Sequence, residues 1–138
     1  MTNLWPKLND LGDSLPFSIV MRQAEALPSI TSNIIRADII PLKSEGGMFR
    51  YEFELFVPAL DYRFTLFQFI HEVQGYPVTF VPYEKLAEEL GCRYTAYGRG
   101  VAASNEEEFN QLLGLILGSR TTKGILEVLI AQSRKLTK

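Results

Sequence analysis

The sequence predicts an α+β fold: a two-layer domain in which a mainly antiparallel sheet of four to five strands packs against helices, two of them C-terminal. The middle third of the chain contains closely spaced strand-like segments joined by short turns, and the last third contains amphipathic segments at helical spacing. The 138 residues suit one domain, and 46% hydrophobic residues can supply its core. We therefore expect a single domain over residues 1–138, with residues 1–15 as a loosely attached segment.

The N-terminal part is predicted to be helical. Leucines recur at helical spacing in the first 15 residues, at Leu4, Leu8, Leu11 and Leu15. Pro6 is acceptable in a first helical turn, and Gly12 and Pro16 end this short segment. A longer helix is predicted over residues 17–30, with Pro28 as its stop signal. Its apolar face consists of Val20, Met21, Ala24 and Leu27.

The middle third is predicted to form four strands. Residues 34–42 are rich in isoleucine and are followed by a turn at 43–47. Residues 49–57 alternate apolar and polar side chains at period two, with Phe49, Tyr51, Phe53, Leu55 and Val57 on one face. Residues 62–73 and 78–81 form the third and fourth strands. Because tight turns join these strands, we expect antiparallel pairing.

The last third is predicted to be mostly helical. A short helix spans residues 83–90, with Pro82 in its first turn and Gly91 as its C-cap. A fifth strand over residues 92–97 ends at the loop Gly98-Arg99-Gly100. Two helices follow at residues 105–118 and 121–135, and their expected caps are the pair Ser104 and Glu107 for the first and Thr121 for the second.

Composition and charge exclude several classes of function. A net charge of −2 disfavours nonspecific nucleic-acid binding, which needs surplus cations. One histidine and one cysteine provide too few ligands for a zinc site, so neither a metal nor another cofactor is predicted. The longest uncharged runs have 11 residues, whereas a membrane span needs about 20 apolar residues. The N-terminus does not resemble a secretory signal, and the lone Cys92 suits a reducing compartment, so a cytoplasmic location is expected.

Three patterns suggest chemistry, and each has a simpler structural interpretation. Cys92 and His71 are a candidate nucleophile and base, although Cys92 also suits a small apolar core position. Glu52 and Glu54 share one strand face, where cross-strand ion pairing explains them better than glycosidase-type catalysis. The glycines beside Arg99 suggest a phosphate loop, but they match no known nucleotide-binding pattern, and three glutamates begin the next helix.

Part of the sequence resembles a family of small uncharacterised bacterial proteins. The resemblance is carried by the segment from Phe53 to Phe64, by Leu66-Phe67, by His71 with Tyr76-Pro77-Val78, and by C-terminal residues that include Glu107-Glu108-Phe109, Leu112-Leu113, Thr122-Lys123 and Ala131-Gln132-Ser133. It covers most of the chain after residue 17. These are mainly core and turn residues, so the resemblance implies a bacterial domain and no particular activity, cofactor or substrate.

Elimination favours a non-enzymatic cytoplasmic module that acts through protein–protein contacts. Phe56 interrupts a polar strand face and residues 62–73 are apolar on both faces, so we expect a homodimer that covers these surfaces. The alternative is a small enzyme or ligand-binding protein. Its site would be a rim of strand ends and loops that contains His71, Tyr76, Tyr83, Tyr94, Tyr97 and Arg99. A third alternative is a single-strand nucleic-acid binder that uses arginines and aromatic residues of one sheet face.

Overall fold

The computed structural model describes residues 2–8 and 12–136, and it confirms the predicted α+β fold. Six strands, rather than four or five, form one antiparallel sheet in the order β1-β2-β3-β4-β6-β5. The strands are β1 (Arg36–Pro41), β2 (Phe49–Val57), β3 (Tyr62–His71), β4 (Val78–Pro82), β5 (Arg93–Thr95) and β6 (Gly98–Ala103). The helices are α1 (Pro16–Ile30), α2 (Glu84–Glu89), α3 (Glu106–Leu117) and α4 (Arg120–Leu136), and a single 3-10 turn, η1 (Pro58–Leu60), joins β2 to β3.

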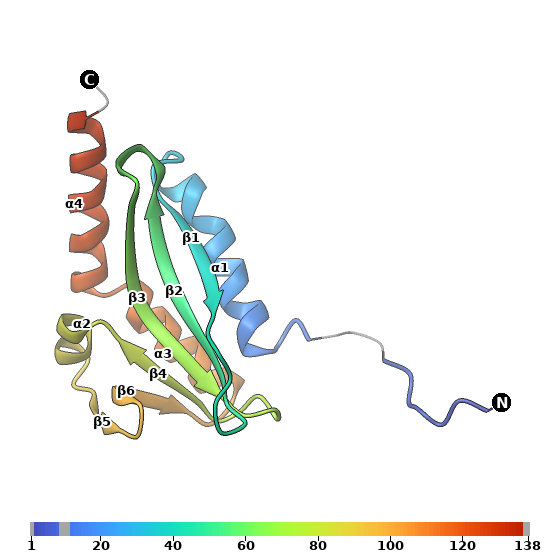
Figure 1. Ribbon diagram of the computed structural model, residues 1–138. Coiled ribbons are helices and arrows are strands. Elements are labelled where there is room, and N and C mark those ends of the chain that lie inside the picture. The colour runs from blue at the N-terminus through green and yellow to red at the C-terminus, as the bar shows by residue number, and fades with distance from the viewer. Residues whose placement is uncertain (1, 9–11, 137–138) are drawn as a thin grey trace.

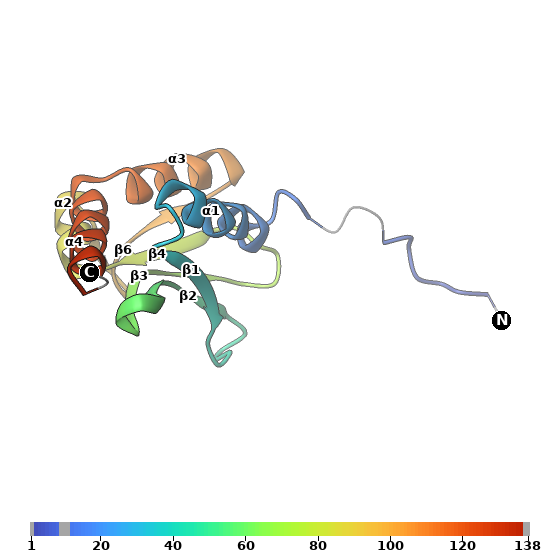
Figure 2. The ribbon, with the colours of Figure 1, turned by 90° about the horizontal axis from the view of Figure 1, so that it is seen from above.

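Helices cover one face of the sheet. Helices α1 and α3 form a layer behind β1, β2 and β3, and α4 stands beside β3 with α2 near its base (Figures 1 and 2). Helix α4 contacts η1 and α2. The strand face turned away from α1 and α3 is therefore open to solvent over β1 and β2.

The core lies between the sheet and these helices. The period-two pattern of β2 predicts its inward face correctly, because Phe53, Leu55 and Val57 are all buried. Phe53 stacks on Phe67 of β3 with 4.8 Å between ring centroids. The register between β2 and β3 shifts at this point, so that Leu66 is an extra residue, and both Leu66 and Phe67 join the core.

The segment Gly98-Arg99-Gly100 begins strand β6, so the prediction that it is a loop is wrong. The reason is close packing between strands: a Cβ atom on Gly100 would overlap the carbonyl oxygen of Phe80 on β4. Glycine here reflects the approach of two backbones and not a turn. The fifth strand is correspondingly short, since β5 pairs with β6 at three positions.

Both predicted caps of the C-terminal helices are displaced. Asn105, not Ser104, caps α3, because its side-chain oxygen accepts a hydrogen bond from the Glu108 amide at 2.9 Å. Glu108 in turn accepts from the Ser104 amide at 2.8 Å, so its carboxylate reaches back to the residue before the cap and not to the cap itself. Ser119, not Thr121, caps α4 by accepting from the Thr122 amide at 3.0 Å.

Helix α1 ends at Ile30 as predicted, but Pro28 is not its stop signal. A proline in the last turn removes only one backbone donor, and the Pro28 carbonyl still accepts from the Asn33 amide at 2.7 Å. Two other details differ from the prediction. Pro82 ends β4 and is not part of α2. Residues 2–8 are not helical, while Leu11 lies outside the described residues. A short segment with no surface to pack against does not repay the cost of helix nucleation.

Candidate functional site

The structure distributes the six residues of the predicted rim over three places. His71 pairs with Val78 of β4, and Val78 pairs with Ala103 of β6. Because β4 and β6 are antiparallel, the strand β6 residue Arg99 lies toward the opposite end of β4 from His71. Tyr83 follows that opposite end of β4. Tyr94 and Tyr97 lie with Arg99 on the β5–β6 hairpin at the sheet edge, where Tyr94 pairs with Arg99. The six side chains therefore do not share one rim.

His71 and Tyr76 serve as packing and anchoring residues at one end of the sheet. The His71 ring lies 5.7 Å from the Phe49 ring and 6.0 Å from the Tyr51 ring, and its Nδ1 is 2.7 Å from the Glu72 carbonyl oxygen. The Tyr76 hydroxyl donates to the Ser14 carbonyl at 3.2 Å. Burial, reinforced by the charge of a nearby glutamate, raises the pKa of Tyr76, so this hydroxyl stays protonated at neutral pH.

The Arg99 side chain is held by contacts with Cys92 and Glu88. Its Nε donates to the Cys92 carbonyl at 3.0 Å, and its Nη1 lies 3.9 Å from a Glu88 carboxylate oxygen. Burial raises the pKa of the Cys92 thiol, although the charge of Arg99 acts in the opposite direction. A protonated, buried thiol is a poor nucleophile. Cys92 and His71 also line two different depressions, so the proposed nucleophile–base pair is not assembled.

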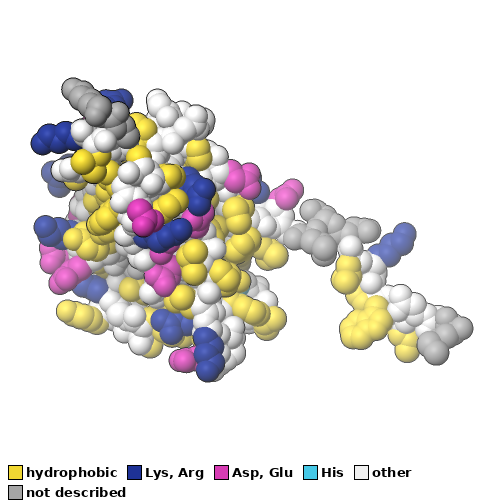
Figure 3. Space-filling view, turned by 45° about the horizontal axis from the view of Figure 1, so that its top comes forward, with side chains coloured by type: hydrophobic (Ala, Val, Ile, Leu, Met, Phe, Trp, Pro, Cys, Tyr) yellow, Lys and Arg dark blue, Asp and Glu magenta, His cyan; other side chains and the backbone are white. Residues whose placement is uncertain are grey.

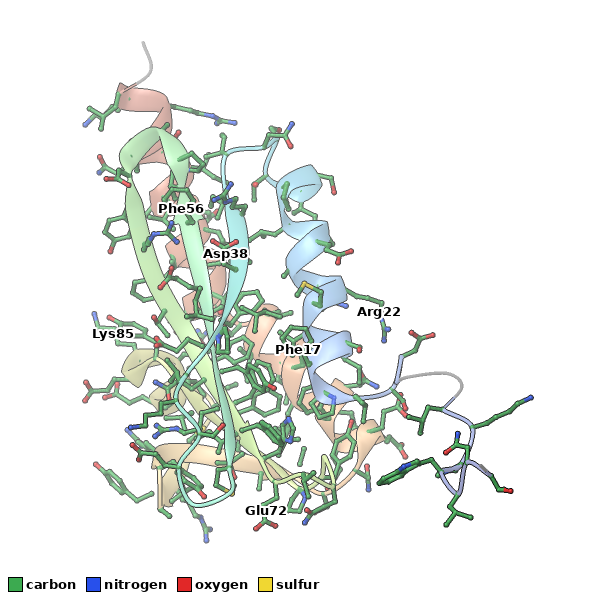
Figure 4. The ribbon with its side chains drawn as sticks, turned by 45° about the vertical axis from the view of Figure 1, so that its right-hand side comes forward. Phe17, Arg22, Asp38, Phe56, Glu72 and Lys85 are labelled. Carbon is green, nitrogen blue, oxygen red and sulfur yellow. The ribbon has the colours of Figure 1, made fainter. Side chains whose placement is uncertain are left out.

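On the open sheet face, several charged side chains contact one another and an aromatic ring (Figures 3 and 4). Arg63 lies 2.8 Å from a Glu54 oxygen and 3.4 Å from an Asp38 oxygen, and its guanidinium lies 4.0 Å from the centroid of the Phe56 ring. Arg36 covers the same ring at 4.7 Å. These groups are engaged with one another across three strands, as the cross-strand interpretation of the glutamates anticipates. The network leaves few free groups for stacking or pairing with a nucleic acid.

The strongest candidate site is a depression between β3 and α4, which we call the α4 groove. It has a volume of about 480 Å³, which falls in the range typical of binding sites. Its lining is mostly apolar and comes from β3, the β4–α2 connection, α2 and α4: Tyr62, Phe64, Tyr83, Lys85, Arg120, Thr121, Gly124, Ile125, Val128 and Leu129.

Strand and helix periodicity explain how these walls form. Tyr62 and Phe64 pair with Val57 and Leu55, so they lie on the same inward face of the sheet as the core. This end of the β2–β3 hairpin lies beside α4 (Figure 1). On the helix, positions 121, 125 and 128 follow one another at the spacing of a single face. Tyr83 closes the inner end, with its ring edge-on to Phe64 at 4.9 Å.

The mouth of the groove carries two cations, Lys85 and Arg120, and beside them a carboxylate, Glu89, whose oxygens are already hydrogen-bonded. Glu89 accepts hydrogen bonds from the Thr121 hydroxyl at 2.6 Å, the Thr121 amide at 2.8 Å and the Arg120 amide at 3.1 Å. These bonds, chiefly those from Thr121, lower the pKa of Glu89. Lys85 forms no ion pair with any residue that the structure describes, and its side chain points outward from α2 (Figure 4).

Gly124 keeps the middle of the groove open. No atom lies within 4 Å of the position that a Cβ would take on this residue. Glycine inside a helix costs about 0.5–1 kcal/mol relative to alanine, so the open space is maintained against the preference of the helix. Val128, on the next turn, is 59% exposed and offers an apolar contact to anything that enters.

The groove combines apolar walls with few available polar groups. Its walls offer apolar area, and the Thr121 hydroxyl at its mouth is already bonded to Glu89. Across the described residues, no group of three His, Cys, Asp or Glu side chains could hold a metal ion. None of the described helices combines the length and apolarity needed to cross a membrane.

Of the predicted rim residues, only Tyr83 lines the α4 groove. The other groove residues come from three separate segments between Tyr62 and Leu129, and single-sequence reasoning has no signal that joins them. Two local signals did exist: a glycine inside an amphipathic helix, and Val128 outside that helix's apolar stripe. No family model, curated protein or solved structure matches the chain.

Proposed function

We propose that the chain is a non-enzymatic binding module that acts through protein–protein contacts in the cytoplasm of a bacterial cell. The α4 groove is its docking surface. The partner is a protein segment that places one or two large apolar side chains in the groove and an acidic side chain beside Lys85. The observation that carries this proposal is an uncovered apolar groove with Lys85 at its mouth, a lysine that forms no ion pair with another described residue.

A protein segment fits this groove better than a small metabolite does. Metabolite sites usually enclose most of their ligand and fix it with several converging polar groups. Here the polar groups at the mouth are Lys85, Arg120 and a Thr121 hydroxyl that Glu89 already holds. Apolar area with one charge to set orientation is typical of grooves that receive an amphipathic peptide. The buried free thiol of Cys92 is compatible with a reducing compartment.

The proposal is tested by selecting 12-residue peptides from a random displayed library against the wild-type chain and measuring their affinities by calorimetry. Selected peptides should carry an acidic residue close to aromatic or aliphatic ones. Gly124→Leu should weaken their binding about tenfold or more, because losing the burial of one large apolar side chain is worth about 1.5–3 kcal/mol. Lys85→Glu should also weaken binding and should reduce its dependence on salt.

Two variants serve as matched controls. Lys43→Glu makes the same charge change on an exposed turn outside the groove, and Gly114→Leu adds the same side chain at an exposed glycine inside α3. Both should bind the selected peptides like the wild type. The proposal fails if the groove variants and the controls bind equally well, or if the selected peptides show no enrichment in acidic residues.

A further inference from the structure

The N-terminal segment, residues 2–8, carries large apolar side chains that touch nothing. We call it the arm. Leu4 is 90% exposed, Trp5 is 82% exposed and Leu8 is 74% exposed. Figures 1 and 2 show the arm extending away from the folded body, and Figure 3 shows its hydrophobic side chains standing apart from the surface. Covering such side chains with another surface lowers the free energy, because it removes apolar area from water.

The root of the arm is fixed to the body. The Leu15 amide donates to the Gly12 carbonyl at 3.1 Å, which closes a turn over residues 12–15. Arg22 of α1 donates to the Asp13 carbonyl at 3.0 Å (Figure 4), and the Tyr76 hydroxyl donates to the Ser14 carbonyl. These bonds set the point at which the arm leaves the body.

An aromatic pocket opens beside this root. It has a volume of about 270 Å³ and lies where the start of α1 meets the ends of β2 and β3. Phe17 of α1 faces the sheet (Figure 4), and its ring centroid lies 5.3 Å from that of Tyr51. The His71 ring continues this row next to Tyr51 and Phe49.

The rim of the aromatic pocket also carries exposed apolar side chains. Val73 is 84% exposed, Leu15 is 46% exposed, Phe49 is 39% exposed and Phe17 is 37% exposed. The described residues include fourteen exposed large hydrophobic side chains, and seven of them belong to the arm or to this rim. Half of the uncovered apolar side chains are therefore concentrated in two surfaces that meet at residues 12–15.

We propose that the arm of one molecule binds in the aromatic pocket of a second copy, and that the exchange is reciprocal, so that two chains form a two-fold dimer. The pocket offers rings to the Trp5-Pro6 pair, and aromatic-lined grooves are the usual receptors for extended proline-containing segments. The aliphatic rim residues Leu15 and Val73 face Leu4 and Leu8 in this arrangement. This interface is separate from the α4 groove, so it stands independently of the proposed function.

The second copy is the occupant that the observations favour. Residues 2–8 lie away from the folded body, and so away from the molecule's own pocket (Figures 1 and 2). A stable interface buries about 1,200–2,000 Å² in total. Reciprocal exchange places two arms in two pockets and so doubles the area that a single arm buries.

The chain provides its own probe, because Trp5 is the only tryptophan. Sedimentation velocity should show a shift from one chain to two as the protein concentration rises. Over the same range, the Trp5 emission should move to shorter wavelength and become less accessible to a quencher. Both changes should follow one dissociation constant, since a single event covers the indole and pairs the chains.

Paired variants locate the contact. Leu4→Asp with Leu8→Asp changes only the arm and keeps Trp5, while Val73→Asp changes only an exposed rim position. Each should weaken dimerisation at least tenfold. Mixing the two should give heterodimers that form more readily than either homodimer, because one intact arm then meets one intact pocket. Val128→Asp, an equivalent change in the α4 groove, should dimerise like the wild type.

Several results would overturn the proposal. One is a chain that stays monomeric with exposed Trp5 at high micromolar concentration. Another is a monomer whose Trp5 is buried at every concentration, which would mean that the arm occupies its own pocket. A third is a dimer that persists in the arm and rim variants and so uses a different surface. Loss of peptide binding in Val128→Asp with normal dimerisation would leave this inference intact.

Discussion

At the scale of single residues, two glycines with opposite surroundings show what an absent side chain does in this fold. Gly100 lies where β6 passes the Phe80 carbonyl of β4, and any Cβ there would overlap that oxygen. Gly114 of α3 is exposed, and no atom lies within 4 Å of its missing Cβ. The first glycine permits a close backbone approach, and the second only lowers the intrinsic stability of a helix.

These two glycines should therefore respond to alanine in opposite directions. Gly100→Ala should lower the free energy of unfolding by about 1–3 kcal/mol, the usual cost of forcing extra atoms into a packed site. Gly114→Ala should raise it by about 0.5–1 kcal/mol, because alanine is the better helix former. Urea denaturation of both variants measures the difference. Equal effects of the two substitutions would mean that β4 and β6 do not pack as closely as described.

At the scale of elements, the junction between α2 and α4 depends on one carboxylate. The first two amides of α4 donate to Glu89, while Ser119 accepts from the third. The Ser119 hydroxyl lies 2.9 Å from the Thr122 hydroxyl and 3.0 Å from the Ile116 carbonyl oxygen. The Thr122 hydroxyl donates to that same carbonyl at 2.7 Å, and all three groups lie in a buried turn. The first three backbone amides of α4 therefore all have hydrogen-bond acceptors, and Glu89 links α2 to α4.

This junction should make stability depend on pH in a predictable direction. Folding lowers the pKa of Glu89, so its contribution is present above the ordinary glutamate pKa of about 4.3. It is lost as the pH falls through the lower pKa of the folded state. Glu89→Gln should therefore be less stable than the wild type at neutral pH, and the difference should shrink below about pH 4.3. Thermal unfolding from pH 7 to pH 3 measures this, with Glu107→Gln as an exposed control, and a constant difference would contradict it.

The sequence predicts elements well where local pattern and burial agree, and poorly where a distant contact decides. Strand β2 spans the predicted residues, and from Phe53 to Val57 its period-two pattern is also its burial pattern, whereas Phe49 is exposed. Strand β6 was missed because the contact that requires Gly100 lies on β4, some 20 residues earlier. The caps of α3 and α4 were displaced because neighbouring Ser, Thr and Asn residues are all competent caps, and tertiary packing selects one.

At the scale of the whole molecule, strand order determines which surfaces can form sites. The predicted rim assumed that His71 and Arg99 lie at one end of the sheet, but the antiparallel order β3-β4-β6 sends them to opposite ends. The same order places the β2–β3 hairpin beside α4, which creates the groove. Neither consequence can be predicted from spacing along the chain, because both depend on pairings between segments that no local signal specifies.

The same strand order predicts an uneven stability across the sheet. Strands β2 and β3 are paired on both sides and carry Phe53, Phe67 and Phe69 into the core, so their amides should exchange only on global unfolding. Strand β5 pairs with β6 alone at three positions, and its Tyr94 is 86% exposed. Its amides should exchange by local opening, at a free energy well below the global value of about 5–15 kcal/mol.

Native-state hydrogen exchange, followed by NMR in increasing low concentrations of denaturant, measures both classes of amide. Strand β1 is the internal control, since it is also an edge strand but pairs with β2 at six positions. The order of protection should be β2 and β3 first, β1 next and β5 last. Because local opening exposes little surface, β5 exchange should also be nearly independent of denaturant. Protection of β5 equal to that of β3 would show that the hairpin unfolds only with the core, and the description of β5 as a weakly held edge would then be wrong.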